Sequence, residues 1–267
     1  MAIKEIFTQY ERASGQQVNT RKSSLTFGKR VSEPTKTHIR HVLQIHNEGG
    51  CGKYLGLPEQ FGRKKIELFQ FIIENVKGKT KGWNNKFLSQ GGKEILLKAI
   101  AMAMPVYTMN CFKLPKGICE DIERIIAHYW WNSQHQGFAT HWVAWDRMKY
   151  SKREGGLGFR DIDKFNDALL AKQAWRILQN PNSLLTRTLR GRYFANSGIL
   201  EANDGVQPSF GWKSLLIGRD LLRKGLRFTV GDGHQIATWS DPWLLTHPPR
   251  PPRKAQDNQP DEISFCK

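Results

Sequence analysis

Aspartate side chains, which could hold a metal ion or move protons, are missing from almost the whole first half of this chain. Its first 120 residues contain no aspartate. Two carboxylate clusters follow, one formed by Glu120, Asp121 and Glu123 and the other by Asp161 and Asp163. Each lies where we expect a helix to start, and there a carboxylate caps the helix or favours the positive end of its dipole. We therefore interpret both clusters as helix-start residues and predict no metal site from them.

The histidines and cysteines also lack a metal-binding pattern. His38, His41, His46 and Cys51 come nearest, but structural zinc usually shows two close ligand pairs, and the second pair is missing here. The four cysteines are widely spaced, which favours reduced thiols in an intracellular protein. We predict neither a metal nor a cofactor for this chain.

A group of cations around one tryptophan gives the strongest chemical signal. The group comprises Arg63, Lys64, Lys65, Lys77, Lys79, Lys81 and Lys86, with Trp83 among its last members. Lys and Arg bind phosphates without reading sequence, and an exposed indole stacks on a base with about 1–3 kcal/mol. We interpret the group as a non-specific nucleic-acid contact, the alternative being a merely solvated basic face.

The overall charge agrees with a polyanionic partner. The 267 residues hold 41 Lys+Arg and 24 Asp+Glu, a formal net charge of +17. Residues 61–160 carry 17 basic and 8 acidic side chains, against 9 and 5 in residues 1–60 and 15 and 11 in residues 161–267. Nucleic acid is the usual partner of such an excess. The longest apolar stretch, residues 95–107, contains Lys98 and is too short to span a bilayer, so we predict no membrane partner.

The spacing of hydrophobic residues and the positions of Gly, Pro and capping residues predict an α+β fold that is mainly helical. The expected helices are one ended by Gly15, one from Arg63 to Gly78 that buries Ile66, Phe69, Ile73 and Val76, one capped by Ser89 that buries Ile95 and Ile100, one after Pro115, one that includes Phe165 to Leu178 and ends before Pro181, and two more near 182–194 and 211–224. The expected strands are 24–27 and 54–58, with a loop over 29–52, and a β-hairpin around Gly231-Asp232-Gly233. Core positions are expected for Trp130, Trp131, Trp142, Trp145, Trp175 and Trp212.

A collinear series of motifs runs through residues 1–245. It comprises GQQVNTRKS (15–23), GKYLGLP (52–58), GW (82–83), LSQGGKE (88–94), CFKLP (111–115), WW (130–131), HW (141–142), GGLGF (155–159), FNDALLAKQ (165–173), VGDG (230–233) and WSDPW (239–243). In this order the motifs resemble those of plant LINE-type (non-LTR) retroelement reverse transcriptases, whose chains often carry a ribonuclease H label. Such a series does not arise by chance.

The resemblance implies the C-terminal part of a longer RNA-directed DNA polymerase, in the nucleus or cytoplasm. Residues 1–60 would be a palm remnant, in which Lys22 protonates pyrophosphate and Tyr54, Leu55 and Gly56 form the primer grip. The parts that follow would be a helical thumb (61–131), a helical connection (132–225), a β-hairpin (226–245) and a disordered Pro-rich tail (246–267).

The missing aspartates determine the predicted activity. Two-metal nucleotidyl transfer needs carboxylates around paired Mg²⁺ ions, and the family supplies them upstream of the Gly15 motif. We expect Mg²⁺ only in the intact family enzyme, no catalysis by this chain alone, and non-specific binding of RNA or an RNA–DNA hybrid. Two alternatives stay open: a domesticated helical module that binds a protein, with an incidental basic face, or an enzyme completed in trans by another fragment.

Overall fold

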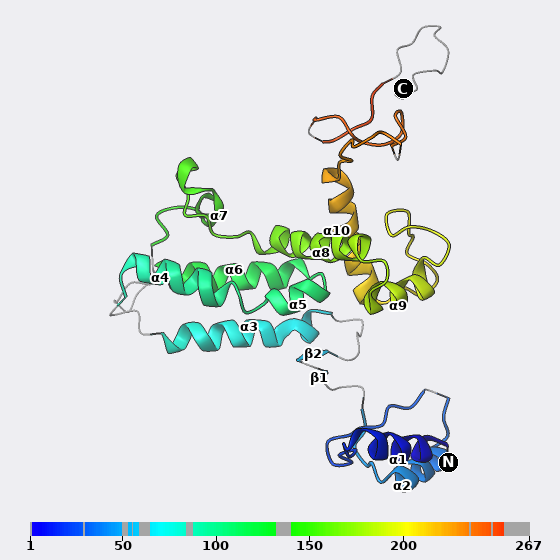
Figure 1. Ribbon diagram of the computed structural model, residues 1–267. Helices are drawn as coiled ribbons and strands as arrows, with labels where there is room; N and C mark the ends of the chain where they lie inside the picture. The colour runs from blue at the N-terminus through cyan, green and yellow to red at the C-terminus, as the bar shows by residue number, and fades with distance from the viewer. Residues whose placement is uncertain are drawn as a thin grey trace. The chain divides into compact units, whose positions relative to one another are not determined.

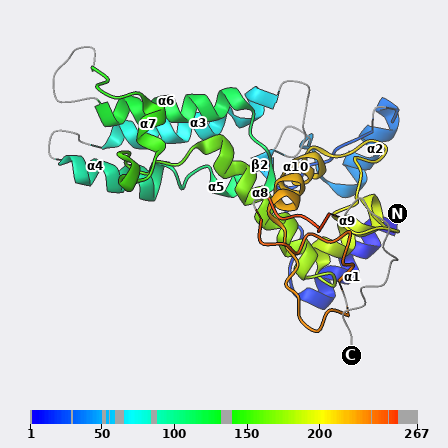
Figure 2. The same ribbon diagram turned by 90° about the horizontal axis from the view of Figure 1, so that it is seen from above.

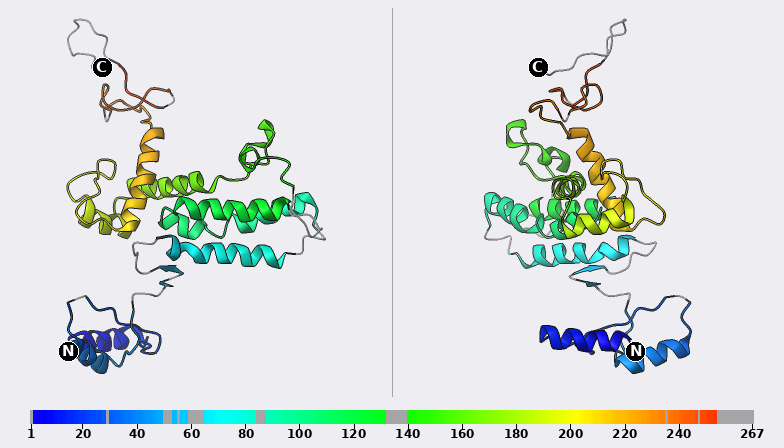
Figure 3. Two further views of the ribbon diagram at one scale, coloured as in Figure 1. Left: turned by 180° about the vertical axis from the view of Figure 1, so that it is seen from behind. Right: turned by 45° about the vertical axis from the view of Figure 1, so that its right-hand side comes forward.

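The computed structural model describes residues 2–28, 30–49, 53–54, 56–58, 65–83, 88–131, 140–234, 236–246 and 248–253. It divides the chain into two compact units, Met1–Lys64 and Lys65–Lys267. The described residues are mainly helical, as predicted (Figure 1, with other views in Figures 2 and 3). None of the described helices is long and apolar enough to cross a membrane.

Two helices are found in the described residues of the first unit. Helix α1, Ala2–Ser14, ends at Gly15, whose φ of 69° is in the left-handed region that terminates helices, as predicted. Helix α2, Glu33–Leu43, lies within the stretch that was predicted to be a loop. The prediction was wrong because it gave no weight to Pro34, which suits a first helical turn, or to charges that match the helix dipole.

Strand structure in the first unit is slight. The strand predicted at 24–27 is a single parallel bridge between Leu25 and Glu48. Strands β1, Lys53–Tyr54, and β2, Leu57–Pro58, form an antiparallel pair in which Lys53 faces Pro58 and Tyr54 faces Leu57. Gly56 lies in their turn with φ of 80°.

Four helices form the first half of the second unit. They are α3, Lys65–Gly82; α4, Gln90–Leu96, which continues as a π-helical turn over Leu97–Ala101; α5, Val106–Cys111; and α6, Lys116–Trp131. Ser89 caps α4 as predicted, because its Oγ accepts the Gly92 N–H at 3.2 Å. The predicted stripe of Phe69, Ile73 and Val76 is fully buried.

Three isoleucines that were predicted to be buried are exposed. Ile66 is 55% exposed because it lies in the first turn of α3, and Ile95 and Ile100 are 68% and 36% exposed. The buried residues of this stretch are Lys93, Leu97 and Ala101, each four residues after the one before, and Ile95 and Ile100 lie outside that row.

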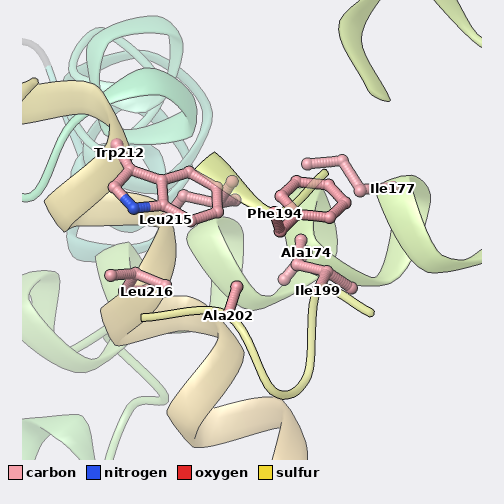
Figure 4. Packing of buried hydrophobic residues seen from close by; sticks show 8 residues of the cluster. All are labelled: Ala174, Ile177, Phe194, Ile199, Ala202, Trp212, Leu215 and Leu216. Atoms are coloured by element: carbon pink, nitrogen blue, oxygen red, sulfur yellow. The ribbon is translucent and has the colours of Figure 1, made fainter. Parts of the chain in front are cut away.

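Most of the second half of the unit packs around one tryptophan. Its elements are α7, Trp145–Lys149, a 3₁₀ turn at Lys152–Glu154, α8, Ile162–Gln179, α9, Leu184–Tyr193, and α10, Phe210–Gly225. Trp212 of α10 stacks on Tyr193 with ring centroids 4.5 Å apart. Figure 4 shows Trp212 among the buried residues Ala174, Ile177, Phe194, Ile199, Ala202, Leu215 and Leu216.

A buried asparagine joins α8 to the link between α5 and α6. Asn166 donates to the Met109 and Phe112 carbonyls at 2.8 and 3.0 Å, and its Oδ1 accepts the Leu114 N–H at 2.7 Å. Beside it, Lys113 pairs with Asp163 at 2.8 Å. The motifs CFKLP and FNDALLAKQ therefore meet in one polar joint that positions α6.

The carboxylate clusters have structural partners. Asp161 caps α8 by accepting the Lys164 N–H at 3.1 Å, as predicted. Glu123 lies in the second turn of α6, not at its start, and accepts the Ile162 N–H at 2.9 Å. It also pairs at 2.8 Å with Lys149, so both clusters support the packing of α6, α7 and α8.

The predicted hairpin at 226–245 is not formed in the described part of that segment. Phe228 donates to the Pro242 carbonyl at 3.0 Å, but no strand ladder continues from it. Proline offers no N–H to a ladder. The carboxylates of Asp232 and Asp241 instead accept nearby backbone N–H groups, those of His234 and Ala237, which competes with cross-strand pairing.

Two of the six tryptophans assigned to the core are exposed. Trp142, in a turn before α7, is 81% exposed, and Trp175 is 43% exposed because it lies beside, rather than on, the buried face of α8. Trp130 and Trp212 are buried, as predicted. The predicted disordered tail falls mainly on residues 254–267, outside the described residues.

Candidate nucleic-acid interface

A groove of about 670 Å³ runs between α3 and α6. Both helices lie side by side in Figures 1 and 2. One wall comes from α3, where side chains recur every three or four residues and so share one side of the helix. The residues that line the groove are Gln70, Ile73, Lys77, Thr80, Lys81, Trp83, Asp121, Arg124, Ile125, His128 and Tyr129.

The helical spacing that places apolar side chains of α3 and α6 in the core also places their neighbours along the groove. Ile73 and Thr80 are buried and form part of its floor, whereas Lys77 and Lys81, one helical turn apart, are exposed on its rim. On the opposite wall Arg124 is exposed next to the buried face of α6. The groove therefore has an apolar floor and cationic edges.

The charges of the groove are only partly neutralised. Arg124 pairs with Asp121 within α6. Lys77 and Lys81 make no ion pair in the described part of the chain. Among the residues that line the groove, Lys77, Lys81 and Arg124 thus outnumber the single carboxylate of Asp121, and the groove attracts anions.

An aromatic pair closes one end of the groove. Trp83 is partly buried and meets Tyr129 edge to face, with ring centroids 5.3 Å apart and an interplanar angle of 75°. Burial raises the pKa of the Tyr129 hydroxyl, and this buried group has no hydrogen-bond partner among the described residues. The indole of Trp83 lines the same groove as Lys77 and Lys81, and a base can stack on such a ring where its face is accessible.

Three of the predicted contact residues, Lys77, Lys81 and Trp83, come together in this groove. Lys79 does not line the groove. It is two residues from both Lys77 and Lys81, and two residues of an α-helix rotate a side chain to about the opposite side of the helix. Lys65 lies at the other end of α3, with its Nζ 4.5 Å from the centre of the Phe210 ring.

The remaining predicted residues lie elsewhere. Lys22, Tyr54 and Gly56 belong to the first unit. Asn19 accepts the Lys22 N–H with its Oδ1 at 3.1 Å, so the N-x-x-K pattern forms a turn. Outside the described residues lie Leu55, Arg63, Lys64 and Lys86.

Sequence reasoning missed the contribution of α6. Arg124 and His128 are one helical turn apart, as are Lys77 and Lys81, and that repeat was the available signal. Without the packing of α3 against α6 the two repeats could not be assigned to one groove. In the described part of the chain no three His, Cys, Asp or Glu side chains gather as metal ligands.

Comparison with known proteins gives two relatives from Arabidopsis thaliana. The chain is 45% identical over 152 residues to the "Uncharacterized mitochondrial protein AtMg00310", a match that covers 57% of this chain and 99% of that protein. The chain belongs to the same family. It is also 35% identical over 197 residues to the "Putative ribonuclease H protein At1g65750".

The second match covers 72% of this chain but only 32% of that relative, so the chain spans about a third of a much longer protein. Its name carries the ribonuclease H label that the resemblance predicted for such chains. No family model matches the chain.

Proposed function

We propose that this family member derives from the reverse transcriptase of a LINE-type retroelement and binds RNA or an RNA–DNA hybrid without sequence preference. The ordered motifs of residues 15–243 and the ribonuclease H label of one relative support the retroelement origin. The binding activity rests on one observation, the juxtaposition of Lys77, Lys81 and Arg124 with Trp83 in a single groove.

The geometry suits a phosphate backbone better than a specific site. A strand in the groove has cations on both sides, from α3 and from α6, and an indole at one end against which a base stacks. None of these groups reads a base edge in a sequence-dependent way, because phosphate contacts and stacking are common to all sequences.

Titration with salt tests this proposal. Fluorescence anisotropy of labelled single-stranded RNA and of an RNA–DNA hybrid, each in two unrelated sequences, would give Kd across a KCl series. We expect similar Kd values for the two sequences and a steep loss of affinity with salt. The triple variant K77Q/K81Q/R124Q should reduce the log–log salt slope on single-stranded RNA by about 2, at about 0.7 for each phosphate that is no longer neutralised.

Lys79→Gln is the matched control for the groove. It removes the same charge from the same helix, but on the side opposite to Lys77 and Lys81. Its slope should equal that of the unchanged protein. If the triple variant kept the full slope, or if Lys79→Gln lowered it as much per charge removed, the groove would not be the binding surface.

We also propose that the chain has no polymerase activity of its own. Its first 120 residues provide no aspartate for the metal pair that nucleotidyl transfer requires, which leaves Lys22 without a reaction to assist. A primer-extension assay with Mg²⁺ on an RNA template should yield no product, whereas extension by the purified chain would contradict this part of the proposal.

A further inference from the structure

A second concentration of positive charge lies within residues 161–267, although that part of the chain as a whole holds 15 basic and 11 acidic side chains. The 33 residues from 168 to 200 contain five basic side chains and no acidic one. Three of the five, Arg187, Arg190 and Arg192, lie on α9. A helix of ten residues therefore carries three positive charges and no negative charge.

The packing of α9 leaves two of these arginines free. Its inner side faces the cluster around Trp212, where Thr186 is buried and Leu189 and Tyr193 pack against the core. Arg187 and Arg190 are exposed. Neither makes an ion pair in the part of the chain that the structure describes.

Arg192 differs from the other two arginines. Its guanidinium lies 5.5 Å from the centre of the Tyr193 ring, and that ring stacks on Trp212. This arginine therefore has a packing role, and the free charge of α9 is carried by Arg187 and Arg190.

A glycine interrupts the same helix without a packing reason. A Cβ added at Gly191 would meet no heavy atom within 4 Å. Alanine would fit there and favour the helix. Gly191 lies one turn beyond Arg187 and next to Arg190, so this side of the helix carries bare backbone beside its cations.

We propose that Arg187, Arg190 and Gly191 form a second phosphate-binding surface, separate from the groove between α3 and α6. The arginines contact phosphates of a nucleic-acid strand, and the missing side chain of Gly191 lets the strand approach the helix closely. This inference rests on the proposed function in one respect, namely that the ligand is a nucleic acid.

An anionic membrane is the other polyanion to consider, and the helix does not suit it. A helix that lies on a membrane needs a free apolar face, whereas the apolar side of α9 is already used in the core. Only Leu184 and Leu185, at the beginning of the helix, are exposed apolar side chains of α9.

The test uses the full chain and labelled single-stranded RNA across a KCl series. R187Q/R190Q should lower the log–log salt slope by about 1.4, at about 0.7 per phosphate. Leu184→Arg adds a cation one helical turn before Arg187, at an exposed position, and should raise the slope by about 0.7. Arg153→Gln is the control, since Arg153 is exposed and unpaired among the described residues but lies outside both surfaces.

Gly191→Ala gives a readout that a purely structural role would not produce. It should raise the melting temperature, because alanine favours the helix, and at the same time raise Kd for RNA. An unchanged Kd in Gly191→Ala would overturn the role of the glycine.

The outcomes separate this inference from the proposed function. If the chain bound no RNA at all, both would fail. If it bound RNA and only the groove variant K77Q/K81Q/R124Q changed the slope, the α9 surface alone would be refuted. The last measurement is binding to vesicles of anionic phospholipid. If R187Q/R190Q weakened binding to these vesicles but left RNA binding unchanged, the proposed α9 phosphate-binding surface would also be refuted.

Discussion

Replacing Asn166 should destabilise the second unit more than any exposed polar substitution. This side chain is fully buried and satisfies three backbone groups, the carbonyls of Met109 and Phe112 and the N–H of Leu114. A buried polar group left without a partner costs about 1–3 kcal/mol. For Asn166→Ala we therefore expect the free energy of unfolding to fall by about 3–5 kcal/mol.

Urea unfolding followed by circular dichroism and tryptophan fluorescence measures this loss. Asn166→Asp separates the loss of hydrogen bonds from the formation of a cavity. Aspartate has the size of asparagine and keeps the oxygen that accepts the Leu114 N–H, but it places a second oxygen where the amide group donated to the Met109 and Phe112 carbonyls. It should be about as damaging as Asn166→Ala. Asn180→Ala is the control: among the described residues the side chain of this exposed asparagine bonds only the Arg176 carbonyl, at 3.1 Å, and its loss should cost no more than about 0.5 kcal/mol.

A loss below about 1 kcal/mol in Asn166→Ala would refute the reasoning, since it would mean that the three backbone groups find other partners. The result also bears on the groove. Asn166 fixes the link between α5 and α6, and α6 carries Arg124.

Two further predictions concern packing and pH. Gly218→Ala should cost about 3 kcal/mol or more in thermal unfolding, because its Cβ would lie 2.2 Å from the carbonyl carbon of Leu170; Gly117→Ala, with no heavy atom within 4 Å, should be neutral or slightly stabilising. Burial raises the pKa of the Asp161 carboxyl, but the Lys164 N–H in the first turn of α8 and the charge of Lys149 lower it by more, so the pKa lies below its ordinary value of 3.8. The ionised carboxylate therefore stabilises the folded chain above pH 3.8, and this stabilisation is lost as the pH falls further. Asp161→Asn keeps a cap and should flatten this acid limb in urea unfolding measured from pH 7 to 2; an unchanged limb would assign the acid loss to other groups.

The local structure of the chain was largely predictable from short-range signals. Gly15, Ser89 and Asp161 fix helix ends through backbone conformation or capping, effects that act within about one turn. The ordered motifs likewise indicated the relationship, and one relative carries the expected label. Helix α2 was missed although Pro34 and its charges were visible, an error of weighting rather than of missing information.

Which faces are buried and which side chains meet was decided only by tertiary structure. The core takes Lys93, Leu97 and Ala101 rather than Ile95 and Ile100, and side-chain carboxylates replace the ladder expected near Asp232. Lys77 and Arg124 are 47 positions apart in the sequence, and they share a groove because the apolar stripes of α3 and α6 pack together. Residue types and spacing therefore determined the helices and their charges, whereas the long-range burial of apolar surface determined which of those charges act together.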